Sequence, residues 1–147
     1  MAKFSNYEIL REHLSQKAIE FKCDADRVIA WKIFSNLFLD TDFSDEELNE
    51  FAEILAKLPF SIAELSHILG REVGPACEQN LMQWPGGEWL AFSDDTLIPK
   101  CIKNQKTNPF QTTKDQDSIP LLTKLMAPFH SNPYKLYKKI QEIRAIS

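Results

Sequence analysis

The chain has few glycines and no long apolar run. Only four of its 147 residues are Gly, and no apolar segment approaches the roughly 20 residues that a membrane-spanning helix needs. The first residues also lack the charged-then-apolar pattern of a secretion signal. The shortage of Gly argues against a β-sandwich or barrel, whose many tight turns use Gly and Pro. We therefore expect a cytoplasmic chain that neither crosses a membrane nor forms a β-fold.

Cysteine is also scarce, which excludes several kinds of site. Cys23, Cys77 and Cys101 are odd in number and widely spaced, so a disulfide framework is not expected. The chain has no CxxC or HxxxH spacing for zinc, no phosphate-binding Gly-rich loop and no Gly-x-Ser-x-Gly elbow. We expect no metal, no cofactor and no enzymatic activity.

Helical signals, by contrast, are dense. Apolar residues make up 44% of the chain and recur at spacings of three and four, and ten of them are Phe. Asn6 and Asp24 are positioned as N-caps of the first two helices. The pattern predicts an all-α fold, a compact bundle of about seven or eight short helices with no significant sheet.

The pattern Phe-Ser-x-x-Glu-Leu occurs twice, beginning at Phe43 and at Phe60, 17 residues apart. In each copy the Ser is the expected N-cap and the Glu three residues later completes a capping box, while Phe and Leu form a hydrophobic staple. Pro59 ends the first of these helices, and Gly70 is the expected C′ residue of the second. Two successive helix starts are predicted.

Charge divides the chain unequally. Residues 1–99 contain 8 Lys/Arg and 18 Asp/Glu, a balance of −10, whereas residues 100–147 contain 9 and 3, a balance of +6. We expect an acidic helical core domain over residues 1–103, a polar loop or linker over 104–117, and a basic helical pair over 118–147 that docks on the core.

Three motifs follow one another in the middle of the chain. They are Trp31 with SNLFLDT, then LPFSIAELSHILGREVGPACEQNL, then GGEW with the aspartates after Phe92. In this order, over residues of about 31–97, the chain resembles a family of small bacterial proteins of uncharacterised function. The resemblance covers a little under half of the chain and implies a small bacterial domain, without implying an activity.

The segment that begins at Asp40 resembles the opening of a calcium loop. Asp40, Asp42 and Ser44 occupy positions 1, 3 and 5, but Asp45 stands where the loop needs Gly and Phe51 where it needs a bidentate Glu. The capping role of Ser44 explains the segment better than calcium does.

Residues 60–81 have the rhythm of a helix-turn-helix, with its turn at Gly70. The second helix would contain no Lys or Arg, and Arg71 is followed directly by Glu72. Since phosphate contacts dominate affinity for DNA, a helical pair inside the core is the favoured interpretation.

His67 and Glu64 lie three residues apart on one helix face, with Glu72 just beyond. An acid–base site would need a pocket that gathers all three side chains. A solvated His–Glu pair is the more common arrangement. Whether the three form a site depends on the fold.

Trp84 and Trp89 flank a Gly-Gly turn. Exposed tryptophans would be anchors for a partner. We expect them instead to cover the core.

Seven carboxylates fall between Asp40 and Glu53, with no Lys or Arg among them. The helix dipole accounts for the three in the first turn. A face of this kind attracts a basic partner, although a simply solvated surface is the plainer alternative. We predict a basic protein partner, most concretely a nuclease-like toxin that the chain neutralises as an immunity-type inhibitor. The expected binding residues are Asp40, Asp42, Asp45, Glu46, Glu50 and Glu53.

The alternative function is that of a nucleic-acid-associated regulator. It would use the helix-turn-helix-like segment or the basic C-terminal helix, in which Lys135, Lys138, Lys139 and Arg144 lie near two tyrosines. Docking of this basic helix on the acidic core is the competing explanation.

Overall fold

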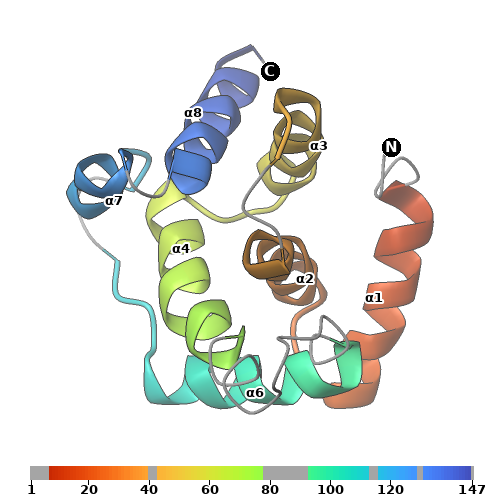
Figure 1. Cartoon of the computed structure of the whole chain (residues 1–147). Helices are drawn as coiled ribbons and strands as arrows, with labels where there is room; N and C mark the ends of the chain where they lie inside the picture. Colours follow the sequence, from red (N-terminus) through yellow and green to blue (C-terminus); the bar gives the residue numbers. More distant parts are fainter. Residues whose placement is uncertain (1–6, 40–42, 78–92, 113–115, 129–130, 147) are drawn as a thin grey trace.

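The computed structural model describes residues 7–39, 43–77, 93–112, 116–128 and 131–146, and over these the chain is all-α (Figure 1). No strand occurs in those ranges, which confirms the predicted fold class. None of their helices is both long and apolar enough to cross a membrane. The helices are α1 (Tyr7–Phe21), α2 (Ala25–Leu39), α3 (Asp45–Ala56), α4 (Ile62–His67), the π-helix η1 (Ile68–Val73), α6 (Asp94–Thr107), α7 (Leu121–Met126) and α8 (Ser131–Ile146).

Helix α2 is the centre of the molecule. Figure 1 views it end-on, with α1 on one side, α4 on the other, α3 above and α6 below. The four consecutive residues from Val28 to Trp31 are all buried, so this helix is covered on every side. A helix that is apolar all round belongs in the interior, and the sequence of α2 places it there.

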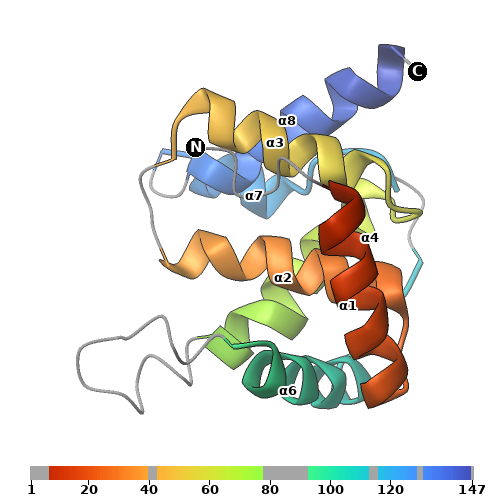
Figure 2. The same cartoon turned by 90° about the vertical axis from the view of Figure 1, so that its right-hand side faces the viewer.

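Helices α3 and α8 form a layer above α2, and α6 lies below it (Figure 2). Phe51 and Leu55 of α3 and Leu136 and Ile140 of α8 all belong to one continuous buried core. Arg144 of α8 adds hydrogen bonds of 3.1–3.4 Å to the backbone carbonyl groups of Leu55, Ala56 and Leu58 at the end of α3. The basic helix therefore packs through apolar side chains and carbonyl groups, and no ion pair joins the described residues of α3 and α8.

Residues 62–77 run as one uninterrupted helical segment, of which α4 and η1 are the first two parts. The predicted end of a helix at Gly70 is wrong, because Gly70 lies inside η1 with ordinary helical backbone. A glycine costs a helix about 1 kcal/mol, and burial of the apolar side chains of Ile68 and Val73 in the same segment outweighs that cost. The helix-turn-helix therefore lacks its turn. Its second helix was expected to continue into residues 78–82, which lie outside the described residues.

Helix α6 extends to Thr107, past residue 104 where the polar loop or linker was expected to begin. Asn104 explains the extension, since its side-chain amide donates a 2.9 Å hydrogen bond to the backbone carbonyl of Glu72. The first residues of the expected linker therefore belong to a helix that is tied to the core.

The two Phe-Ser-x-x-Glu-Leu starts differ in their capping. Ser44 and Glu47 form the complete capping box that was predicted, with each side chain bonded to the other's backbone N–H. Ser61 accepts a 3.1 Å bond from the backbone N–H of Glu64, but the carboxylate of Glu64 does not return to Ser61. It binds Arg27 instead. The second predicted capping box is thus only half formed.

Candidate functional site

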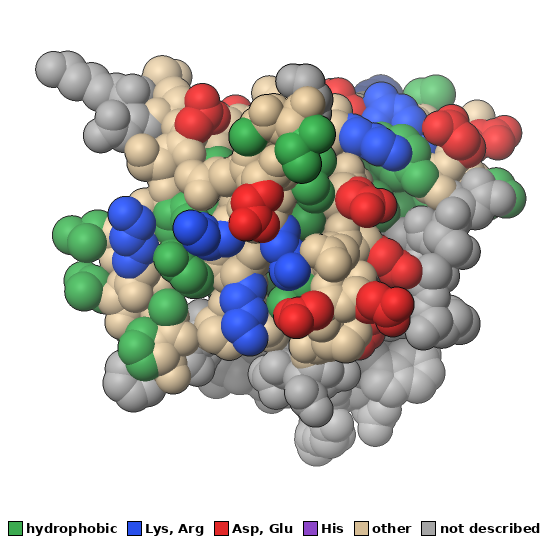
Figure 3. Space-filling model, turned by 90° about the horizontal axis from the view of Figure 1, so that it is seen from above, with side chains coloured by type: hydrophobic (Ala, Val, Ile, Leu, Met, Phe, Trp, Pro, Cys, Tyr) green, Lys and Arg blue, Asp and Glu red, His purple; other side chains and the backbone are tan. Residues whose placement is uncertain are grey.

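The acidic face of α3, defined here as Asp45, Glu46, Glu50 and Glu53, lies on the outside of the molecule. Asp45, Glu46 and Glu53 are exposed and Glu50 is half-buried. The turn of the helix explains this, because Leu48, Phe51 and Leu55 are buried on the opposite side. Figure 3 shows Asp and Glu side chains gathered right of centre, over α3, and Lys and Arg side chains left of centre, over α8.

The structure brings together four of the six predicted binding residues, all on α3. The other two, Asp40 and Asp42, lie outside the described residues. None of the four carboxylates takes part in an ion pair within the part of the chain that the structure describes. The helix dipole stabilises Asp45 and Glu46, in the first turn, by about 0.3–1 kcal/mol each. Glu50 and Glu53 lie beyond the first turn, so the helix dipole does not stabilise their charges.

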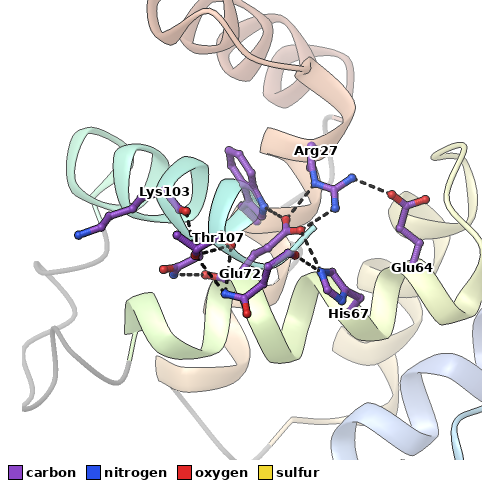
Figure 4. A network of polar contacts seen from close by, with 9 residues as sticks. Arg27, Glu64, His67, Glu72, Lys103 and Thr107 are labelled. Atoms are coloured by element: carbon purple, nitrogen blue, oxygen red, sulfur yellow. Dashed lines mark hydrogen bonds and ion pairs between the residues drawn. The ribbon is translucent and has the colours of Figure 1, made fainter. Parts of the chain in front are cut away.

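A second cluster lies in the interior, around Glu72 (Figure 4). The Glu72 side chain is 0% exposed, and its Oε1 accepts from Arg27 Nε at 2.9 Å and from Trp31 Nε1 at 2.8 Å. Its Oε2 accepts from Arg27 Nη2 at 2.6 Å. Arg27 Nη1 donates to Glu64 Oε2 at 2.8 Å. Helices α2, α4 and η1 therefore meet in one charge-assisted network.

His67 closes this cluster on the side of α6. Its Nε2 lies 2.7 Å from the backbone carbonyl of Asn108 and 3.8 Å from Glu72 Oε2. Because a carbonyl oxygen only accepts, Nε2 carries the proton. The ring of Phe110 packs edge-on against the imidazole with centroids 5.4 Å apart. The predicted trio of Glu64, His67 and Glu72 is thus brought together.

Sequence reasoning missed the centre of this cluster, which is Arg27 with Trp31. The available signal was that Arg27 directly precedes the apolar run from Val28 to Trp31, because a guanidinium drawn into the core requires carboxylate partners. Burial opposes the charge of Arg27, but the hydrogen bonds with Glu72 and Glu64 outweigh it and raise the pKa of the guanidinium above its ordinary value.

The geometry of the cluster suits a structural role. Both oxygens of Glu72 are already bonded, and the carboxylate is sealed from solvent. The guanidinium of Arg27 has used all three of its nitrogens. A reactive group must reach a substrate, and the sealed Glu72 cannot. Arg27 borders a small pocket beside Glu64, but each of its nitrogens already donates to a carboxylate. The cluster joins α2, α4 and η1 and so holds these helices in place relative to one another.

The described residues contain no group of three or more His, Cys, Asp or Glu side chains that could hold a metal ion. No disulfide joins Cys23, Cys77 or Cys101. Burial raises the pKa of the Cys101 thiol, which keeps it protonated and unreactive at neutral pH.

These features define a class: a small all-α domain with a fixed interior ion pair and a charged outer helix. The chain belongs to the family described as Domain of unknown function (DUF7079), whose model matches residues 25–131. No curated protein and no solved structure matches the chain. The matched range begins with α2 and ends at the first residue of α8, so it contains both the acidic face and the Arg27–Glu72 pair.

Proposed function

We propose that this chain is a non-catalytic binding protein that captures a basic protein partner through the acidic face of α3. In its most concrete form it is an immunity-type inhibitor, and the partner is a nuclease-like toxin whose nucleic-acid cleft the acidic face occludes. The single observation that carries the proposal is the row of outward carboxylates on α3, without ion-pair partners among the described residues.

The rigidity of α3 supports this proposal. The capping box at Ser44 fixes the start of the helix, and Arg144 binds the carbonyl groups at its end. Its inner side is buried against α8. A preorganised surface loses little conformational entropy on binding, so more of the electrostatic attraction appears as affinity.

The charge arrangement also supports rapid capture. Carboxylates of one sign on one face raise the rate at which a basic partner is encountered, by 10-fold or more at low salt. A nuclease cleft is basic because it binds phosphates, and an acidic helix competes for the same side chains.

The experiment is co-purification with the product of the adjacent gene, followed by measurement of the affinity of the complex. The test variant is the triple reversal Glu46→Lys, Glu50→Lys and Glu53→Lys. The matched control reverses three exposed glutamates outside α3, namely Glu8, Glu12 and Glu142.

We expect the triple reversal in α3 to abolish binding and the control to retain most of it. Equal affinity of the two variants would remove α3 from the interface. If the adjacent product is not basic and does not co-purify, the inhibitor proposal fails as a whole.

Two observations disfavour the nucleic-acid alternative. Arg144, one of its four expected basic contacts, is already bonded to carbonyl groups of α3. The predicted turn at Gly70 is absent. Salt-sensitive retention of the intact chain on DNA or RNA, lost after Lys135→Glu and Lys138→Glu, would favour the nucleic-acid function over the inhibitor function.

A further inference from the structure

A wide groove lies between α4 and α7. Both helices are on the left in Figure 1. Its volume is about 1020 Å³, and one wall is the outer side of α4 with the start of η1. The opposite wall is formed by residues 109–111, by residues 118–120 and by α7. Enclosed pockets for small molecules have volumes of about 300–1,000 Å³. An open groove of this size suits a segment of polypeptide better than a small molecule.

Helix α7 forms the outer wall and leaves most of the surface of its three leucines exposed. Leu121 and Leu122 are each 70% exposed and Leu125 is 62% exposed, while no residue of α7 is buried. In Figure 3 hydrophobic side chains project at the left edge of the molecule, where α7 lies. The helix has six residues, and isolated helices of fewer than about 12–15 residues are marginal in water. An apolar wall of this kind gains stability when a partner covers it.

The wall along α4 is fixed, so the groove is formed in advance. The hydrogen bond between His67 and the Asn108 carbonyl holds α4 against the end of α6. The backbone N–H of Ala63 donates to the Gln116 carbonyl at 2.7 Å, and Ser61 Oγ donates to Gln116 Oε1 at 3.0 Å. These bonds hold both ends of the segment that leads to α7.

The charge of the groove indicates the chemistry of its occupant. Among the lining residues that the structure describes, the fully charged side chains are Arg71 and Lys124, and none is Asp or Glu. Both are exposed, on opposite walls, and the surface between them includes Ile119, Leu121 and Leu122. An apolar strip with a basic residue on each side complements an apolar strip with acidic flanks.

We propose that this groove binds an amphipathic helical segment of another protein that presents apolar residues at i, i+3, i+4 and i+7 and carries acidic side chains on both flanks. Leu121 and Leu122 contact the apolar strip, and Arg71 and Lys124 pair with the flanks. An anionic membrane shares part of this chemistry, but a flat bilayer cannot fill a concave groove. The site is separate from the acidic face of α3, so it can be tested independently of the proposed inhibitor function.

The probe is a synthetic peptide with Leu at i, i+3, i+4 and i+7 and Glu on both flanks, labelled for fluorescence anisotropy. A second peptide has Lys in place of every Glu. With the intact chain, we expect the Glu peptide to bind at least about 10-fold more tightly than the Lys peptide. Leu122→Glu should abolish this binding. Its matched control is Ile19→Glu, because Ile19 is 72% exposed on α1, away from the groove. The control should bind like the unmodified chain.

Loss of binding in Leu122→Glu could also result from misfolding, so a second variant tests for a reversed preference between the two peptides, which a misfolded chain would not show. Arg71→Glu with Lys124→Glu should transfer the preference to the Lys peptide, whereas Lys103→Glu on α6 should leave it unchanged. Failure of both peptides to bind, or equal affinity for them, would overturn the proposal. It would also be overturned if anionic phosphatidylglycerol vesicles bind through Leu122 while the peptides do not. Self-association in sedimentation that is lost in Leu122→Glu would instead assign the groove to a second copy of the chain.

Discussion

Arg27 and Glu72 form a two-bond ion pair in the interior, with Nε–Oε1 and Nη2–Oε2 distances of 2.9 and 2.6 Å. The two residues are 45 positions apart and join α2 to the π-helix η1. Trp31 donates to the same carboxylate, so Glu72 satisfies two side chains of the central helix at once. Removal of the carboxylate would leave both donors buried without this acceptor.

We therefore expect Glu72→Ala to lower the free energy of unfolding by about 3–5 kcal/mol, because it leaves a buried positive charge without its main partner. The double variant Arg27→Met with Glu72→Met removes both charges and should be less destabilised than Glu72→Ala. Urea unfolding of the two variants measures the difference. A Glu72→Ala protein within about 1 kcal/mol of the unmodified chain would show that the pair contributes little.

Gly70 offers a test of the continuous helical segment. Its backbone is helical, and a Cβ added there would meet no atom within 4 Å. Gly70→Ala should raise stability by about 0.4–1 kcal/mol, because Ala restricts the unfolded chain without strain in the folded one. Thermal unfolding followed by circular dichroism measures the change. A loss of stability would indicate that Gly70 adopts a left-handed turn.

The two serine caps should differ in their contribution to stability. Ser44→Ala removes one capping box and should cost about 1 kcal/mol. Ser61→Ala removes a cap and also the hydrogen bond to Gln116, which positions the segment before α7, so its cost should be larger. Equal losses in chemical denaturation would show that the bond between Ser61 and Gln116 adds nothing.

Asp94 should make stability depend on pH in the acid range. Burial acts to raise the pKa of Asp94, but the bonds from Lys32 and His13 outweigh it and lower the pKa below the ordinary 3.8. A lowered folded-state pKa means that the stabilisation is complete above about pH 4 and is lost as the pH falls through the folded value. Asp94→Asn should be less stable at neutral pH and should show a shallower decline below about pH 4. Urea unfolding across this range measures both effects, and parallel curves for the two proteins would contradict the assignment.

Capture of a basic partner by the acidic face should depend on salt. The association rate should fall as the ionic strength rises, because the Debye length shortens from about 10 Å at 0.1 M to about 3 Å at 1 M. The reversal of Glu46, Glu50 and Glu53 should remove most of this dependence, and the control at Glu8, Glu12 and Glu142 should preserve it. Stopped-flow mixing measures the rates. A rate that does not change with salt would exclude electrostatic steering by α3.

The all-α fold was predictable because the apolar spacing and the capping signals agree over most of the chain. The box at Ser44 formed as predicted because its two members are three residues apart and Glu47 has no competing ion-pair partner among the described residues. The box at Ser61 did not, since Glu64 has a stronger partner in Arg27, 37 residues away, which no local pattern reveals. The predicted helix end at Gly70 was wrong for the same kind of reason. Burial of neighbouring residues overrides the low helix propensity of glycine.

The acidic face could be located from sequence because helical periodicity alone decides which side of α3 faces outward. The groove beside α7 could not be located from the sequence. It depends on where the fold places residues 109–111 and 118–120, where no periodicity applies, and on how far α7 lies from the core. Tertiary placement, rather than residue type, leaves Leu121 and Leu122 uncovered.

The packing of α3 on α8 has a consequence for how the chain folds during synthesis. Arg144 and the Ala56 carbonyl that it binds are 88 residues apart, so α3 is made long before the helix that covers it. Until α8 leaves the ribosome, the apolar side of α3 lacks this cover and the core remains incomplete. Ribosome-bound chains that stop before residue 131 should therefore be digested by protease as unfolded chains are, and full-length released chains should resist.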